Sequence, residues 1–204
     1  MRTIEVFAEV SCPFTHVGLT RLIAARGERG LTEPVLLIRA WPLEAVNGDP
    51  VDAATLVPEI EALRRDVAPE LFKGFDPTSV PTSTIPALAA TAAAYRAGPA
   101  QGEAFGLRVR RAFFEEGAEI GDPNVVDGLL DELGLPHATD ADRRSVEADH
   151  AEGVARGVTG SPHFFTGTDD FFCPSLDITH DDDGFRIAFD AAGFAAFLSA
   201  AFDE

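Results

Sequence analysis

Cysteine is scarce in this sequence, whose 204 residues include only Cys12 and Cys173. Two cysteines cannot form the disulfide network that stabilises a small secreted domain. Long apolar runs are also missing, since no stretch approaches the roughly 20 residues of a membrane-spanning helix. No apolar segment with a cleavage site follows Met1, so we expect no secretory signal and a cytoplasmic location. The two cysteines are therefore candidates for chemistry or for packing.

Basic residues are few as well: 16 Lys and Arg stand against 34 Asp and Glu, which gives a formal net charge of -18 at pH 7. A protein that binds nucleic acid needs a basic surface to neutralise phosphates, so we expect no nucleic-acid partner. The same acidity disfavours anionic membrane surfaces, and we expect no membrane partner. Hydrophobic residues make up 46% of the chain, which is typical of a soluble globular protein.

The order of apolar patterns indicates an α/β protein with a helical middle. Alternating apolar residues over 4–8 predict a strand, the pattern over 19–25 predicts a helix, and the apolar run 35–41 predicts a second strand. This succession favours a parallel pair with a right-handed crossover. Between about residue 51 and residue 150 almost nothing is typical of a strand, and helical spacing recurs over 57–63, 87–95, 105–114, 125–133 and 140–156.

Strand patterns return near the C-terminus. Residues 160–165 predict a strand, and a polar turn over 167–170 precedes a short apolar stretch. The run from Asp181 to Gly184 predicts a solvent-exposed hairpin turn, which is followed by the alternating residues 185–189. The closing segment 191–202 has the spacing of an amphipathic helix, and exposed phenylalanines on it would support a homodimer.

Cys12 stands at the turn between the first strand and the first helix. Pro13 fits the first helical position, where its missing N–H costs nothing, so we expect Cys12 at the helix N-terminus. Unpaired backbone N–H groups and the positive end of the helix dipole favour a thiolate there. Thr15 could donate a hydrogen bond to the sulfur, and His16 could add positive charge. The position predicts a reactive cysteine with a lowered pKa; a buried packing role is the alternative.

Three motifs, at residues 12–18, 113–122 and 157–164, together span nearly the whole chain and resemble those of DsbA-like proteins with a thioredoxin fold. Residues 12–18, Cys-Pro-Phe-Thr-His-Val-Gly, are similar to the Cys-Pro-x-Cys active site of cytoplasmic members. Residues 113–122, an aromatic pair followed by a Glu-Gly step and Ile-x-Asp, resemble the signature of the helical domain. Residues 157–164, Gly-Val-Thr-Gly-Ser-Pro-His-Phe, resemble the cis-proline loop.

The resemblance implies an α/β, thioredoxin-like fold with an inserted all-helical domain. Residues 1–43 and 151–204 would form the thioredoxin-like domain, and residues 44–150 the insertion. The implied catalytic residues are Cys12, Thr15 and Pro162. A peptide or glutathione would pair with the backbone before the cis proline. The residues that would contact this substrate are Pro13, Phe14, His16, Ser161 and His163.

The motif departs from its redox relatives at Thr15, which stands where they carry a second cysteine. The second thiolate of a dithiol motif releases a mixed disulfide, and Thr15 cannot do this. We therefore expect a DsbA-like thiol oxidoreductase that acts through a single reactive cysteine on a thiol-containing small molecule or peptide. Cys173 is a candidate replacement for the resolving thiol, although such a cysteine more commonly packs in a core.

Two alternatives remain open at this point. The same branch resembles kappa-class glutathione transferases and 2-hydroxychromene-2-carboxylate isomerases, in which a serine stands at the position of Cys12 and glutathione supplies the thiolate. Glutathione is thus a candidate co-substrate, and no covalently bound cofactor is expected. The chain would otherwise be a redox-inactive protein that binds a peptide in the cis-proline groove. The spacing of Cys12, His16, His163 and Cys173 is not that of a zinc module, so we expect no metal site.

Overall fold

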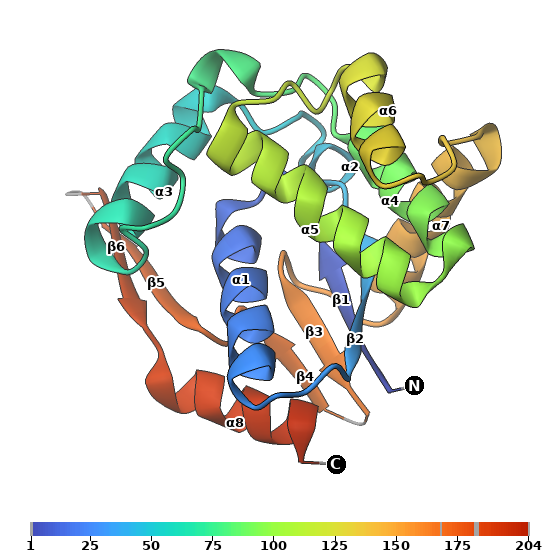
Figure 1. The fold of residues 1–204 in the computed structure, drawn as a ribbon. Coiled ribbons are helices and arrows are strands. Elements are labelled where there is room, and N and C mark those ends of the chain that lie inside the picture. The colour runs from blue at the N-terminus through green and yellow to red at the C-terminus, as the bar shows by residue number, and fades with distance from the viewer. Residues whose placement is uncertain (1, 168, 182–183, 204) are drawn as a thin grey trace.

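The computed structural model of this chain describes its residues 2–167, 169–181 and 184–203. Strands β1 (Thr3–Ala8) and β2 (Val35–Ala40) run parallel and are joined by helix α1 (Pro13–Glu28), as Figure 1 shows. Strand β3 (His163–Thr166) pairs antiparallel with β1, and β4 (Asp169–Phe172) pairs antiparallel with β3. The order β2-β1-β3-β4 confirms the predicted strand–helix–strand start and places β1 inside the sheet.

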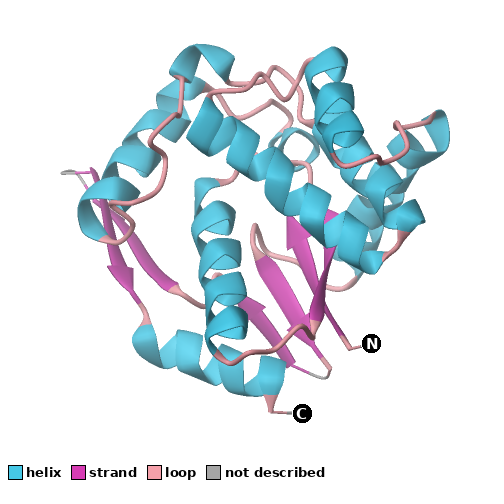
Figure 2. Cartoon of the chain, viewed as in Figure 1, coloured by secondary structure: helices cyan, strands magenta, loops and turns pink. Residues whose placement is uncertain are grey.

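The chain between β2 and β3 is helical, and Figure 2 shows no strand in it. Each segment with helical spacing coincides with one of the helices α3 to α7, although the segments 125–133 and 140–156 extend one residue past α6 and α7, so the predicted helical middle is confirmed. Helix α2 is too short to show a period in the sequence. No helix in the described residues combines the length and apolarity that crossing a bilayer requires. The bounds are α2 (Leu43–Asn47), α3 (Ala53–Asp66), the 3-10 helix η1 (Pro77–Ser79), α4 (Ile85–Ala97), α5 (Pro99–Glu116), α6 (Pro123–Glu132) and α7 (Asp140–Ala155).

Two further strands form a separate sheet. Strands β5 (Leu176–Asp181) and β6 (Gly184–Phe189) pair antiparallel on either side of the predicted hairpin turn, of which residues 182–183 lie outside the described part of the chain. The hairpin packs against α3, where Arg65 donates a hydrogen bond of 3.0 Å to the carbonyl oxygen of Phe185. It therefore extends from the sheet domain to the helical part, as Figure 1 shows.

The polar turn after β3 is shorter than the sequence predicts. Asp169 and Asp170 already belong to β4, where they pair with Thr166 and Phe165; residue 168 is not among those described. Strand β4 lies at the edge of the sheet, and both aspartates are exposed. Charged residues are common on edge strands, so a polar composition does not distinguish this strand from a turn.

One face of the sheet is covered by α1 and by the C-terminal helix α8 (Ala191–Phe202). Their apolar side chains meet alternate residues of β1, Ile4 and Val6, in one buried cluster. Phe197 of α8 is 1% exposed and belongs to this cluster. The aromatic stripe of α8 thus packs inside its own chain. A homodimer stays a prediction, but the phenylalanines of α8 do not form the exposed apolar surface from which we predicted it.

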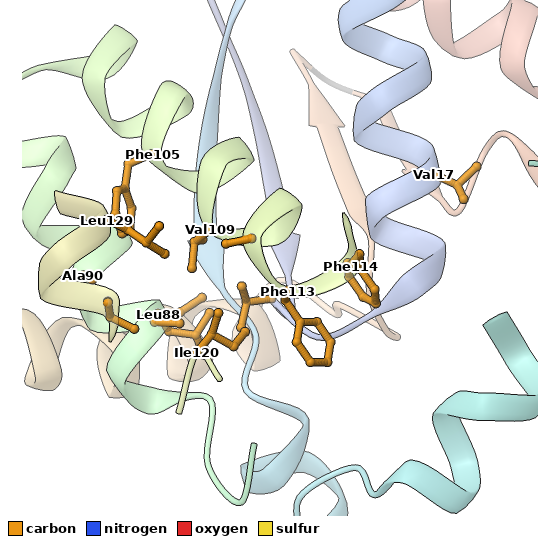
Figure 3. Close-up of a cluster of buried hydrophobic side chains, with 14 of the residues drawn as sticks. Val17, Leu88, Ala90, Phe105, Val109, Phe113, Phe114, Ile120 and Leu129 are labelled. Carbon is orange, nitrogen blue, oxygen red and sulfur yellow. The ribbon is translucent and has the colours of Figure 1, made fainter. Parts of the chain in front are cut away.

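A second buried cluster is centred on α5 and continues into α1, β2 and the β5–β6 hairpin (Figure 3). Phe105, Val109 and Phe113 lie on α5 and are fully buried. Within the helical part, their neighbours in this cluster include Leu88 of α4, Leu129 of α6 and Ile120 of the loop after α5. Phe114 instead stacks on the ring of His16 in α1, with 4.8 Å between centroids. The helix that follows Cys12 therefore also anchors the helical part.

A pair of glycine substitutions tests this packing. A Cβ at Gly74 would lie 2.0 Å from the backbone carbonyl oxygen of Glu115, so we expect Gly74→Ala to lower the free energy of unfolding; overpacking typically costs about 1–3 kcal/mol. Gly128 in α6 has no atom within 4 Å of such a Cβ, and Gly128→Ala should raise stability by up to about 1 kcal/mol. Urea midpoints with unchanged slopes measure both effects. Equal midpoints would contradict the close contact at Gly74.

Candidate functional site

Cys12 is the residue immediately before α1, and Pro13 occupies the first turn of the helix. Cys12 is 5% exposed. Its thiol donates a hydrogen bond to the carbonyl oxygen of Ser161, with 3.2 Å between the two atoms. The peptide bond between Ser161 and Pro162 is cis. The turn after β1 and the loop before β3, far apart in the sequence, thus meet at the sulfur.

The hydroxyl of Ser161 links the strand, the helix and the proline loop. It accepts a hydrogen bond of 2.8 Å from the backbone N–H of Glu9. It also lies 2.7 Å from the hydroxyl of Thr15, so one hydroxyl donates to the other. Thr15 is fully buried. The residue at the position of a second motif cysteine is therefore a structural hydroxyl tied to the proline loop.

Burial raises the pKa of the Cys12 thiol, so the prediction of a lowered pKa is wrong in direction. The donors expected at the helix N-terminus are present, because the hydroxyl and the backbone N–H of Thr15 both lower this pKa. Loss of water around the sulfur outweighs them, since a thiolate depends on solvation more than a thiol does. The charge of Glu59 raises the pKa further. Near pH 7, Cys12 is a neutral thiol in this conformation.

His16 faces the helical part rather than the sulfur. Its Nε2 lies 2.9 Å from Oε1 of Glu115. The Glu115 carboxylate also accepts hydrogen bonds from the backbone N–H groups of Phe72 and Lys73. Burial alone would raise the pKa of Glu115, but these hydrogen bonds hold it below its ordinary value. His16 and Glu115 line a separate cavity of about 570 Å³ between α1 and α5.

His163 is also engaged away from Cys12. Its Nδ1 accepts a hydrogen bond of 3.2 Å from the backbone N–H of Thr159, which leaves the ring proton on Nε2. Nε2 then donates to Oδ1 of Asp170 at 2.9 Å. The ring stacks on Phe165 with 5.0 Å between centroids. These contacts hold the proline loop against β4.

A cavity of about 180 Å³ opens beside Cys12. Three residues of the predicted substrate-binding set line it: Pro13, Phe14 and Ser161. The remaining wall comes from α2, α3 and the loop between them, and it carries Glu59. Pro162 packs beneath α1, where a Cβ on Gly18 would lie 3.6 Å from its ring. The structure thus brings part of the predicted set together and leaves both motif histidines out.

Two buried charged residues that the sequence analysis does not single out support this arrangement: Glu9 and Arg110, each 1% exposed. Burial raises the pKa of Glu9. Burial lowers the pKa of Arg110 to about 10. Arg110 donates a hydrogen bond of 3.4 Å to the carbonyl oxygen of Glu9. The sequence signals that could have identified them are the position of Glu9 directly after an apolar strand, three residues before Cys12, and that of Arg110 four residues before the buried Phe114.

Cys173 is a second buried thiol, and both cysteines are free. Its backbone N–H donates to the carbonyl oxygen of Pro162 at 3.0 Å. Burial raises the pKa of its thiol to about 12, and the charge of Cys12 acts in the same direction. Such a thiol is a poor resolving nucleophile, because exchange requires the thiolate. Among the described residues, no three His, Cys, Asp or Glu side chains are grouped so that they could hold a metal ion.

The family model of the DSBA-like thioredoxin domain matches residues 3–181. The cytosolic disulfide reductase DsbM from Pseudomonas aeruginosa shares 18% identity with a TM-score of 0.61, and 97% of each chain is covered. Its structure with GSH gives 18% identity and a TM-score of 0.64, covering 99% of this chain and 100% of the reductase.

A structure of a 2-hydroxychromene-2-carboxylate isomerase is similar as well. It shares 17% identity with a TM-score of 0.64, and the match covers 83% of this chain and 88% of the isomerase. No curated protein matches the sequence. The predicted thioredoxin-like α/β fold is confirmed by these matches. The boundaries of the two domains stay a prediction.

The buried thiol leads to a pH prediction. Because burial raises the pKa of Cys12, we expect its main alkylation inflection to lie above the ordinary thiol value, with the thiol form predominant below it. Iodoacetamide alkylation rates against pH, followed by peptide mapping, measure this. Cys12→Ser identifies the signal from Cys173, which should react more slowly still. A Cys12 inflection below the ordinary thiol value would show that the helix N-terminus outweighs burial.

Proposed function

Since this chain belongs to the DSBA-like thioredoxin family, we propose that it catalyses thiol–disulfide exchange through Cys12 alone. One observation carries the proposal: a single thiol lines the cavity at the start of α1. Thr15, at the position of a second motif thiol, is hydrogen-bonded to Ser161 instead. The occurrence of a disulfide reductase and an isomerase among proteins of the same fold supports an enzymatic role.

The proposed reaction has a balanced first step. The sulfur of Cys12 attacks one sulfur of a disulfide R–S–S–R′ and forms the mixed disulfide Cys12–S–S–R. The other sulfur leaves as R′–S⁻ and takes up the proton that Cys12 loses. One half of the substrate is then a thiol, and the other half is still part of a disulfide, now with Cys12; the two-electron reduction is complete only when this second half is released.

Glutathione completes the cycle in this proposal, because the motif has no second thiol. One glutathione thiolate attacks the Cys12 sulfur, releases R–SH and leaves glutathione bound to Cys12. A second glutathione attacks the glutathione sulfur of that mixed disulfide, forms glutathione disulfide and restores the Cys12 thiol. In sum, one disulfide is reduced to two thiols, and two glutathiones are oxidised to one disulfide.

The lining of the cavity suggests how a small thiol or peptide would be held. Pro13, Phe14 and Ser161 share the cavity with Cys12 and would contact the substrate. His16 and His163 would act indirectly, by holding the segments that carry these residues. We further propose a cytoplasmic location, with which the cytosolic reductase of the same fold is compatible.

A second function is favoured by a specific observation. The Cys12 thiol is buried and donates a hydrogen bond to a carbonyl oxygen, so it can equally donate to the sulfur of a bound glutathione thiolate. Glutathione would then be the nucleophile of a transferase or isomerase, and Cys12 would only orient it. The isomerase among the proteins of this fold is consistent with this role.

The monothiol proposal predicts the outcome of reaction with glutathione disulfide. We expect one glutathione adduct, located on Cys12 by mass spectrometry, and no adduct on Cys173. Thr15→Cys should resolve the adduct into an intramolecular disulfide and gain insulin reductase activity, because a second thiolate is then available. Thr15→Ser, which keeps the hydroxyl, is the matched control and should retain the adduct. Absence of any adduct on the natural chain would favour a redox-inactive binding protein.

Cys12→Ser separates the two enzymatic functions. Exchange through a mixed disulfide should be abolished, because no sulfur remains to form it. A glutathione-dependent isomerase or transferase should keep substantial activity, because a serine hydroxyl also donates a hydrogen bond to a thiolate. The two activities are measured as reduction of a mixed disulfide and as glutathione-dependent isomerisation of a chromene carboxylate. Retained exchange in Cys12→Ser would contradict the proposed mechanism.

A further inference from the structure

Helix α3 places a carboxyl group in the cavity of Cys12. Its buried residues Leu56, Ile60 and Leu63 form the apolar face of the helix. Glu59 follows Leu56 by three positions and therefore lies on the same face. It is half-buried and lines the cavity together with Cys12. In the sequence, Glu59 could have been recognised as a candidate site residue because it is a charged residue within the apolar face of a helix.

The Glu59 carboxyl has no hydrogen bond or ion pair to any described residue. Burial alone raises its pKa to about 7. Buried carboxylates are normally hydrogen-bonded or paired with a cation, and Glu9 in the same region shows that pattern. Glu59 therefore presents a carboxyl group in the cavity that is paired with no described residue.

We propose that Glu59 binds an ammonium group of the substrate and thereby selects disulfides of aminothiols for exchange at Cys12. The cavity holds the two groups that such a molecule needs, a thiol for its sulfur and a carboxylate for its amine. Its volume of about 180 Å³ suits a small disulfide end group rather than a folded polypeptide. The inference rests on the exchange reaction proposed above, and names its substrate class.

The selective step is the mixed-disulfide step already described, with R a short chain that ends in an ammonium group. Cys12–S–S–R forms, the other half leaves as a thiolate, and this thiolate takes the Cys12 proton. The ammonium and the Glu59 carboxylate remain paired and exchange no proton with the reacting sulfurs. Pairing also neutralises the charge that raises the pKa of Cys12, so substrate binding favours the attacking thiolate.

Among the described residues that line the cavity, Glu59 is the one charged group. On α3, Arg65 pairs with Asp66 at the far end of the helix. On α1, Arg21 donates to the carbonyl oxygens of Val67 and Ser175. On neighbouring elements, Asp76 before η1 accepts from Thr78, Glu44 of α2 accepts from Ser83 and Thr84, and Arg186 of β6 lies opposite Thr179 in the hairpin. Burial is the one cause of the shift at Glu59.

Three disulfides of similar size test the proposal: cystamine, which is cationic, 2-hydroxyethyl disulfide, which is neutral, and dithiodiglycolate, which is anionic. The natural chain should form the Cys12 adduct with cystamine about tenfold faster than with the neutral disulfide, and slowest with the anionic one. Glu59→Gln should remove this order. Glu61→Gln, an exposed glutamate on the same helix, is the matched control and should keep it.

The pH dependence adds a second readout. Cystamine stays cationic at neutral pH, so its preference should be full above pH 7 and should disappear as Glu59 is protonated below about 7. Because a carboxyl with a raised pKa weakens the folded state as pH rises, Glu59→Gln should unfold at a higher urea concentration than the natural chain at pH 8. This result would also show that the variant is folded.

Equilibrium binding separates this inference from the reaction itself. Cys12→Ser cannot carry out exchange, so its binding of disulfides can be measured by calorimetry. It should bind cystamine about tenfold more tightly than 2-hydroxyethyl disulfide. The double variant that combines Cys12→Ser with Glu59→Gln should bind the two disulfides equally. If the natural chain forms no adduct but this difference persists, the exchange reaction fails and the ammonium site stands. If Glu59→Gln changes all three adduct rates equally, or leaves the cystamine preference intact, the ammonium site is overturned.

Discussion

The buried carboxylate of Glu9 is the interaction on which the rest of the site depends. It lies just after β1, and its two oxygens accept hydrogen bonds from four donors in three segments: the N–H groups of Val10, Ser11 and Leu43 and the hydroxyl of Thr84. A buried carboxylate without such donors costs several kcal/mol. The Cys12 turn, the start of α2 and the N-terminal cap of α4 are therefore held around one carboxylate. Arg110 of α5 donates a hydrogen bond to the backbone carbonyl oxygen of the same residue.

The state of the thiol follows from a competition within this framework. A helix dipole contributes at most about 2 kcal/mol to a thiolate at its N-terminus. Full burial can shift a pKa by up to about 3–5 units, and each unit corresponds to about 1.4 kcal/mol. Cys12 is enclosed between α1, the proline loop and α3, so burial prevails in the unliganded chain. Reactivity then depends on what enters the cavity, because a substrate changes both the solvation and the charge around the sulfur.

The motif at residues 113–122 of the helical part has a structural role that its sequence does not reveal. Phe114 and Glu115 hold the ring of His16 by stacking and by a hydrogen bond. Gly117 has a φ of 69° and ends α5, and Asp122 caps α6 by accepting from the N–H of Asn124 at 2.8 Å. The motif thus docks the helical part on the first turns of α1. His16, which looks like a candidate for tuning Cys12, serves this docking instead.

Local patterns in the sequence determined the elements of this protein, and the tertiary structure decided their chemistry. Strand alternation, Pro13 and the Asp122–Pro123 cap act over a few residues, so the position of Cys12 and the helices were predictable. The pKa of Cys12, the partners of His16 and the approach of Glu59 were not, because they depend on segments that only the folded chain brings together. Burial and charge proximity are properties of three-dimensional packing, and a single sequence specifies them only through the complete fold.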